Sequence, residues 1–235
     1  MNLEAVLFDM DGTLVDTEIL WWETVERVAA ELGYRLAPGD AGDITGASVW
    51  DAAEFLASRT SSSAVVLADR LDDAFCAAVA SGVVVRPGVL RLLDLLAAVE
   101  IPVGLVSASP RRVVSHVLPA VGADRFAITV AAEDSPRNKP HPDPYLTALA
   151  ALRARAEFCV AVEDSPTGVA SAETAGCRVL AVPSVLPIPS GPRRLVRSSL
   201  EEIDVTVLGE MIGGEMIGGA GTVPLRQSAA ERSPR

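Results

Sequence analysis

An alternation of short apolar strands and amphipathic helices runs from residue 86 to about residue 182 and constrains the fold more than any other feature. Strands are expected at 103–106, 127–131, 158–162 and 179–182, and helices at 89–99, 110–118, 145–155 and 167–175. Alternation at this spacing is typical of a parallel sheet with helices on both faces. The sequence therefore predicts an α/β fold.

A further strand is predicted at the start of the chain, where the apolar residues 5–8 lead into Asp9 and Asp11. In an open α/β sheet, ligands bind beyond the carboxyl ends of the strands. The chain turns at Gly12, so both carboxylates can face one crevice, and the backbone N–H groups of Gly12 and Thr13 can form an anion-binding turn. Carboxylates placed in this way can hold a hard cation, attack phosphorus or move a proton.

Residues 15–85 show helical periodicity instead of strand patterns. Apolar residues form one face over 17–32, and further helices are expected at 49–58 and 65–81. We therefore expect an α/β core formed by residues 1–14 and 86–208. Residues 15–85 would form an inserted, all-helical cap domain over the strand ends.

The pattern weakens after Pro183. Residues 200–208 are expected to add an edge strand, and residues 209–235 are predicted to be a disordered tail. Within this tail, Gly209–Gly213 is repeated as Gly214–Gly218. A tandem copy of this length is too short for a repeat architecture.

The charge balance and the cysteines limit the partners and the compartment. With 20 basic and 31 acidic residues, the net charge is −11, which argues against nucleic acid or an anionic membrane as partner. An anionic substrate would need a local cation, which Mg²⁺ can supply. The three cysteines suggest neither a disulfide framework nor a zinc site, and no signal peptide or membrane span is apparent. These features predict a cytoplasmic protein.

Polar residues also follow the strand at 103–106. Ser109 and Pro110 have the form of a helix N-cap followed by a first-turn proline. The hydroxyl of Ser107 and nearby backbone N–H groups, including that of Ala108, would then face an anion near the start of the helix. We expect phosphate to be bound by Gly12, Thr13, Ser107, Ala108 and Lys139.

Lys139 lies in a loop with three prolines in five residues, which hold it in an extended segment. A lysine held near carboxylates balances their charge and can grip a phosphoryl oxygen. The strand at 158–162 leads into Glu163 and Asp164. Because strand residues alternate between faces, Asp164 is favoured as a Mg²⁺ ligand, with Glu163 either a second ligand or its neighbour.

This ordered set of an acid pair, a hydroxyl, a lysine and a second acid pair resembles the haloacid dehalogenase (HAD) superfamily. The resemblance covers residues 4 to about 182 and is closest to the subgroup with a helical cap, which includes phosphoglycolate phosphatase-like enzymes and β-phosphoglucomutase. It implies a Rossmann-like sheet, Asp9 as nucleophile, Asp11 as general acid/base and Ser107 and Lys139 as phosphate holders. It also implies a Mg²⁺ site formed by Asp9, the backbone carbonyl of Asp11 and Asp164.

The expected function is that of a Mg²⁺-dependent phosphatase that hydrolyses a small phosphorylated metabolite through an aspartyl-phosphate on Asp9. A β-phosphoglucomutase-like mutase is the alternative. The mutases that this chain resembles carry a histidine on the first cap helix and an arginine in a cap loop. The corresponding residues 19–23 and 44–49 contain neither. A phospho-receiver signalling module is a third possibility, although such modules lack the helical insertion. The sequence leaves the substrate and the oligomeric state open.

Overall fold

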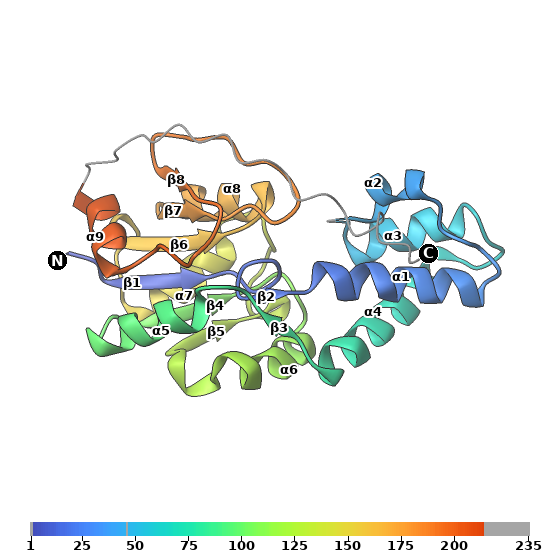
Figure 1. Ribbon diagram of the computed structural model, residues 1–235, viewed down its shortest axis with the longest axis horizontal. Coiled ribbons are helices and arrows are strands. Elements are labelled where there is room, and N and C mark those ends of the chain that lie inside the picture. Colours follow the sequence, from blue (N-terminus) through green and yellow to red (C-terminus); the bar gives the residue numbers. More distant parts are fainter. Residues whose placement is uncertain (1, 46, 214–235) are drawn as a thin grey trace, which may run out of the picture.

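The computed structural model describes residues 2–45 and 47–213, and its centre is a six-stranded sheet with the strand order β5-β4-β1-β6-β7-β8 (Figure 1). Every neighbouring pair in this sheet is parallel. The strands are β1 (Ala5–Phe8), β4 (Val103–Val106), β5 (Ile128–Val130), β6 (Cys159–Glu163), β7 (Arg178–Ala181) and β8 (Arg194–Val196). The predicted parallel α/β sheet is confirmed.

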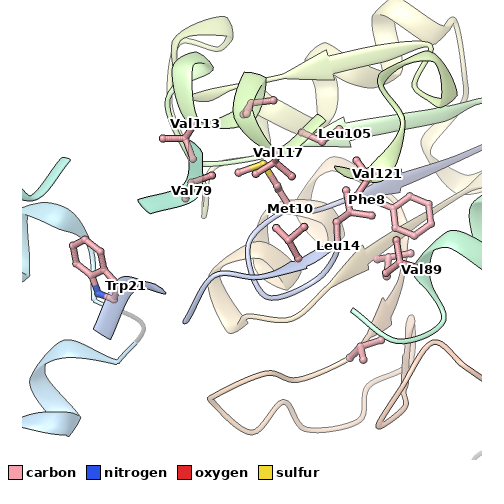
Figure 2. Packing of buried hydrophobic residues seen from close by; sticks show 14 of the residues in the cluster. Phe8, Met10, Leu14, Trp21, Val79, Val89, Leu105, Val113, Val117 and Val121 are labelled. Atoms are coloured by element: carbon pink, nitrogen blue, oxygen red, sulfur yellow. The ribbon is translucent and has the colours of Figure 1, made fainter. Parts of the chain in front are cut away.

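Helices cover both faces of the sheet: α5 (Val89–Ala98), α6 (Arg111–Val121), α7 (Asp143–Leu152), α8 (Pro166–Ala175) and α9 (Val205–Gly213). Side chains of β1 alternate between the two faces. Val6 and Phe8 join the buried cluster that includes α5 and α6, and Figure 2 shows Phe8 in this packing. Ala5 and Leu7 join the cluster formed with α7 and α8. Because both faces are buried, β1 is apolar throughout.

Four further helices lie between two short strands: α1 (Glu18–Glu31), α2 (Ala41–Ile44), α3 (Val49–Ala57) and α4 (Ala64–Ser81). They form a group beside the carboxyl edge of the sheet (Figure 1). The expectation that no strand occurs in residues 15–85 was wrong, because β2 (Val15–Asp16) and β3 (Val84–Val85) pair antiparallel. Two residues are too few to show an alternating pattern.

The insertion also packs directly on the core. Val79 of α4 and Val113 of α6 belong to one buried cluster, and Figure 2 shows them close to each other. On the surface, the Arg112 guanidinium forms ion pairs with Asp72 and Asp73 of α4. The helical insertion is thus connected to the core both by the β2–β3 pair and by the contact of α4 with α6.

The end of the described chain differs from the expectation. The last strand, β8, forms one edge of the sheet, and residues 205–213 form α9, so the edge strand predicted at 200–208 was wrong. Leu208 and Met211, three residues apart on α9, are buried in the core. The first copy of the repeated segment, residues 209–213, is therefore helical; the rest of the predicted tail, residues 214–235, lies outside the described residues. No helix within the described ranges has the length and apolarity needed to cross a membrane.

Gly88, at the start of α5, gives a test of how closely this helix packs against the backbone at Leu200. Gly88 has φ +83°, and a Cβ there would lie 2.4 Å from the backbone carbon of Leu200. Gly33 has φ +79°, but a Cβ at that position would meet nothing within 4 Å. Both Gly→Ala changes strain the backbone, and only the change at Gly88 adds a collision with backbone. We expect Gly88→Ala to lower the free energy of unfolding by about 1–3 kcal/mol more than Gly33→Ala, measured by urea denaturation. Equal losses would contradict this packing.

Candidate active site

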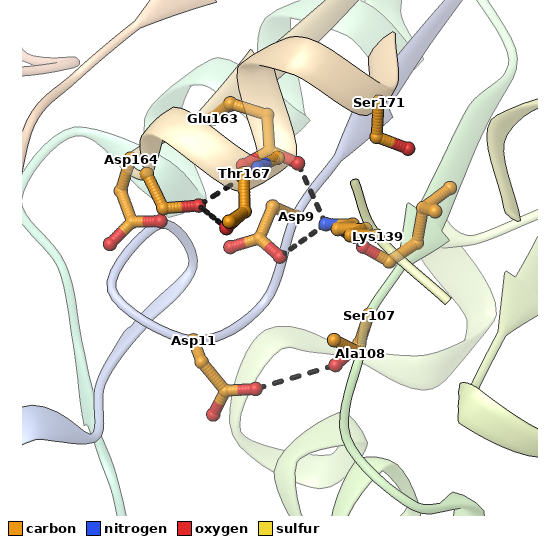
Figure 3. Close-up of polar contacts among 12 residues, drawn as sticks. Asp9, Asp11, Ser107, Ala108, Lys139, Glu163, Asp164, Thr167 and Ser171 are labelled. Atoms are coloured by element: carbon orange, nitrogen blue, oxygen red, sulfur yellow. Dashed lines mark hydrogen bonds and ion pairs between the residues drawn. The ribbon is translucent and has the colours of Figure 1, made fainter. Parts of the chain in front are cut away.

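The polar residues predicted at the strand ends meet at the carboxyl edge of the sheet (Figure 3). Asp9 follows β1, Ser107 follows β4, and Glu163 is the last residue of β6. Lys139 comes from the loop between β5 and α7. Parallel strands end at the same edge, so residues far apart in the sequence lie close together here.

Lys139 is at the centre of this group. Its Nζ donates to Asp9 Oδ1 and to Glu163 Oε1, both at 2.7 Å, and to the carbonyl oxygen of Val106 at 2.9 Å. Only 5% of its side chain is exposed. Burial lowers the pKa of Lys139, but the carboxylates of Asp9 and Glu163 outweigh that effect and raise the pKa above its usual value. The only lysine in the chain is therefore a buried cation.

Glu163 is fully buried beside this lysine. Its Oε1 also accepts a hydrogen bond from the hydroxyl of Tyr145, a buried residue of α7 that the sequence did not single out. Burial raises the pKa of Glu163, and the charge of Lys139 partly opposes the rise. Because Lys139 and Tyr145 both donate to Glu163 Oε1, these two residues set the orientation of the Glu163 side chain.

Asp9, Glu163 and Asp164 form an acidic cluster in which one carboxylate oxygen from each lies within 4.8 Å of the others. Asp9 Oδ2 is buried and has no hydrogen-bond partner. Burial, and then the nearby Asp9, raises the pKa of Asp164, whose Oδ2 accepts from the hydroxyl of Ser184. Three carboxylates with one lysine leave negative charge uncompensated, and oxygen ligands are those that Mg²⁺ prefers. The acidic cluster therefore fits a divalent cation.

The Asp11 carboxylate is not part of the acidic cluster. The role predicted for Asp11 in metal binding concerns its backbone carbonyl, a different atom, and stays a prediction. Asp11 Oδ1 accepts from Thr17 Oγ1 at 2.9 Å, and its Oδ2 accepts from Ser109 Oγ at 2.7 Å and from Ser107 Oγ at 3.3 Å. Burial, and then the charge of Asp9, raises the pKa of Asp11. A carboxyl group that stays protonated to higher pH, and that lies beside the acidic cluster, is suited to proton transfer.

The prediction that Ser109 caps the following helix was wrong. Helix α6 begins after Pro110 without a side-chain cap, because the hydroxyl of Ser109 is bonded to Asp11. The backbone N–H of Ser109 donates to Ser107 Oγ at 2.9 Å, which fixes the Ser107 hydroxyl near Asp11. The carbonyl oxygen of Ala108 accepts from the side chain of Asn138 at 3.1 Å. This bond joins the loop after β4 to the loop that carries Lys139.

Gly12 and Thr13 lie in the turn after Asp11. Gly12 has φ +77°, and a Cβ there would lie 2.0 Å from Asp164 Oδ2. The side chain of Thr13 is buried, and its Oγ1 has no hydrogen-bond partner. The backbone N–H groups of Gly12 and Thr13, which were predicted to bind phosphate, instead donate to the carbonyl oxygens of Val15 and Met10 at 2.9 and 3.3 Å. The turn thus packs closely against the acidic cluster, and Gly12 is required both by its backbone angle and by the nearby Asp164.

Sequence reasoning did not identify Thr17, Ser109, Tyr145 and Ser184 as members of this site. Each supplies a hydroxyl to one acid of the site: Thr17 and Ser109 to Asp11, Tyr145 to Glu163 and Ser184 to Asp164. Only Ser109, close to Ser107 after a predicted strand, carried a signal that could have identified it.

Gly168 offers a test of how Glu163 is held. A Cβ at Gly168 would lie 1.8 Å from Glu163 Oε2. Gly168→Ala must therefore displace Glu163 and loosen its contact with Lys139. If Glu163 helps to hold a catalytic metal ion, we expect about a hundredfold loss of activity, because a displacement of a catalytic group by about 1 Å has an effect of this size. Ala170→Gly, on the exposed side of α8, should cost about 1 kcal/mol of stability but leave activity unchanged. Full activity of Gly168→Ala would show that the position of Glu163 is unimportant.

Fold and site together define an α/β enzyme with an acidic cluster and a buried lysine at the carboxyl edge of its sheet. Residues 6–182 match the model of haloacid dehalogenase-like hydrolases, and the chain belongs to this family. It is 33% identical over 211 residues to hexitol phosphatase A of Escherichia coli K12, covering 88% of this chain and 95% of that protein. It is 30% identical over 219 residues to hexitol phosphatase B of the same strain, covering 91% and 96%.

A solved structure agrees with this family and fold. The crystal structure of CbbY from Rhodobacter sphaeroides in complex with phosphate superimposes with a TM-score of 0.76 at 25% identity, covering 88% of this chain and 99% of that chain. The family and the Rossmann-like fold implied by the sequence resemblance are therefore confirmed.

Proposed function

We propose that this chain is a Mg²⁺-dependent phosphatase that hydrolyses a small phosphomonoester, with Asp9 as the nucleophile. The observation that carries the proposal is the environment of Asp9: one oxygen is anchored by Lys139 and the other is buried without a partner beside two further acids. Asp11, with a raised pKa, lies in the same site. The relatives named as hexitol phosphatases support the same reaction class.

Asp9, Glu163 and Asp164 would hold the metal ion, together with the backbone carbonyl of Asp11. A bound Mg²⁺ supplies positive charge that offsets the repulsion between a carboxylate and a phosphate. Lys139, whose Nζ lies 2.7 Å from Asp9 Oδ1, would supply further positive charge. Ser107 and the backbone N–H groups of the turn after β4, including that of Ala108, would bind the phosphoryl oxygens.

In the first step, the Asp9 carboxylate attacks phosphorus and the bond from phosphorus to the ester oxygen breaks. Asp11 gives its proton to the departing oxygen, so the alcohol leaves uncharged and Asp9 carries the phosphoryl group. A raised pKa serves this step, because Asp11 must hold a proton before it transfers one.

In the second step, water attacks the phosphorus of the aspartyl-phosphate. Asp11 takes the proton of this water, the bond between phosphorus and Asp9 breaks, and inorganic phosphate leaves. The hydrogen bond from Thr17 links Asp11 to the base of the helical insertion. A lid formed by this insertion would exclude bulk solvent in the first step and admit water in the second.

Removal of the metal tests this proposal. With Mg²⁺, we expect the purified chain to release inorganic phosphate from at least one ester in a panel of small phosphomonoesters. Chelation with EDTA should abolish the release, and an excess of Mg²⁺ should restore it. Release that is unchanged by EDTA would contradict the metal dependence.

The products distinguish the alternatives. An isomerised sugar phosphate, formed only in the presence of a bisphosphate, would favour a mutase. A stable phosphorylated chain without turnover would favour a signalling module. Either result would contradict the proposed phosphatase activity.

A further inference from the structure

Tyr145 of α7 contacts two members of the candidate active site. Its hydroxyl donates a hydrogen bond to Glu163 Oε1, and both side chains are fully buried. Its ring lies beside Lys139, whose Nζ is 5.3 Å from the ring centroid. A buried phenol is a large apolar group with one polar atom that needs a partner. Tyr145 therefore holds the acid through its hydroxyl and faces the lysine with its ring.

The two donors to Glu163 share one of its oxygens. Oε1 accepts from Lys139 and from Tyr145, and Figure 3 shows the bond from the lysine. Oε2 is buried and, within the described part of the chain, has no hydrogen-bond partner. A buried carboxylate oxygen without a donor is costly unless a cation or an ordered water satisfies it. The donors on Oε1 thus leave the lone pairs of Oε2 available to a cation, either directly or through a water molecule.

The two donors differ in charge. Lys139 also donates to Asp9, so it is shared between two acids and offsets part of the negative charge that attracts a cation. The hydroxyl of Tyr145 is uncharged at neutral pH. It orients Glu163 and leaves the charge of the acidic cluster unchanged. Tyr145 is thus the donor whose hold on Glu163 does not oppose the binding of a cation.

We propose that Tyr145 is a positioning residue for divalent-cation binding: its hydroxyl fixes Glu163 within the acidic cluster, and its removal weakens the affinity for Mg²⁺. This inference rests on the proposed Mg²⁺-dependent phosphatase and adds a residue that acts only through Glu163. Loss of a group that orients a metal ligand typically weakens metal binding by about 10–100-fold.

Tyr145→Phe tests the proposal, because it removes the hydroxyl and keeps the ring beside Lys139. The metal-free chain, titrated with magnesium chloride in a calorimeter without any ester, should show a Kd about tenfold or more above that of the wild type. The Mg²⁺ concentration that gives half-maximal phosphate release should rise by the same factor. At saturating Mg²⁺, the KM for p-nitrophenyl phosphate should stay within about twofold of the wild-type value. A general packing defect would not separate these two quantities.

Tyr34→Phe is the matched control, because Tyr34 is the other tyrosine of the chain. Its hydroxyl donates to Asp40 Oδ2 at 2.9 Å in the helical insertion. The same kind of bond, from a phenol to a carboxylate, is therefore lost away from the acidic cluster. The Kd for Mg²⁺ should not change in this variant. A rise equal to that of Tyr145→Phe would contradict the proposal.

A double-mutant cycle tests whether Tyr145 acts through Glu163. Glu163→Gln keeps the shape of the side chain and removes the charge that attracts the ion, so it should weaken Mg²⁺ binding by itself. In this background, the added change Tyr145→Phe should alter the Kd by less than about threefold. A rise as large as in the wild-type background would show a different route and overturn the proposal. Wild-type affinity of Glu163→Gln for Mg²⁺ would overturn it as well, even if Tyr145→Phe failed to fold.

Calorimetry does not depend on turnover, so the failure of this inference differs from the failure of the proposed function. Equal Kd values for the wild type and Tyr145→Phe would refute the role of Tyr145, even if the wild type hydrolyses p-nitrophenyl phosphate. Absence of hydrolysis by a wild type that binds Mg²⁺ would refute the proposed function, and the Kd values would still decide the role of Tyr145. Absence of Mg²⁺ binding by the wild type would refute both.

Discussion

Asp9→Asn releases inorganic phosphate at a rate about four to six orders of magnitude below that of the wild type, if Asp9 is the nucleophile. An amide has almost the shape of a carboxylate but lacks the charge and nucleophilicity that attack on phosphorus requires. Its oxygen can still accept from Lys139, which also keeps its bonds to Glu163 and Val106. The fold should therefore survive, and the loss should be chemical.

The measurement is phosphate release with Mg²⁺ under single-turnover and steady-state conditions. Asp16→Asn is the matched control, since Asp16 is a half-buried acid in β2, close in sequence but outside the acidic cluster. It should keep activity near that of the wild type. If Asp9→Asn retained more than about one hundredth of the activity, another group would have to be the nucleophile.

The second large effect is expected from Lys139→Met, which removes the buried cation between Asp9 and Glu163. Two carboxylates would then face each other in a buried site without their shared partner. Removal of one member of a buried ion pair costs about 3–5 kcal/mol of stability. Loss of the positive charge beside the reacting phosphate should also lower activity by about two to three orders of magnitude.

Urea denaturation and phosphate release measure these two losses separately. The double variant Lys139→Met with Glu163→Gln removes one of the stranded charges and should recover part of the stability, but not the activity. Arg137→Met, which removes an exposed cation two residues away, is the control and should change stability little. Unfolding of Lys139→Met at the same urea concentration as the wild type would contradict the importance of this ion pair.

The sequence predicted the sheet because its central strands are buried on both faces. Segments such as Ala5–Phe8 and Val103–Val106 must then be apolar throughout, which makes them visible without any structure. The acids, the hydroxyl and the lysine were found for the same reason, since each follows a visible strand or lies in a loop fixed by prolines. The helical insertion was visible from its 3.6-residue periodicity.

What the sequence missed depends on contacts between distant residues. The bonds of Tyr145 to Glu163 and of Ser184 to Asp164 arise only after the strands are brought together, and nothing local marks these hydroxyls. Serine is a preferred N-cap residue, but the hydroxyl of Ser109 donates to the nearby Asp11 carboxylate instead of capping the helix. Residues near 205 favour a strand by their β-branched side chains, yet burial of Leu208 and Met211 on one face favours a helix.

The buried position of Lys139 also has a practical use. Reagents that acylate amines find one side-chain target in the entire sequence, and the fold keeps that amine between two carboxylates. Its acylation must wait until the site opens to solvent. The rate of that single modification, followed by mass spectrometry, would therefore report how often the catalytic centre is exposed and how far a bound ester protects it.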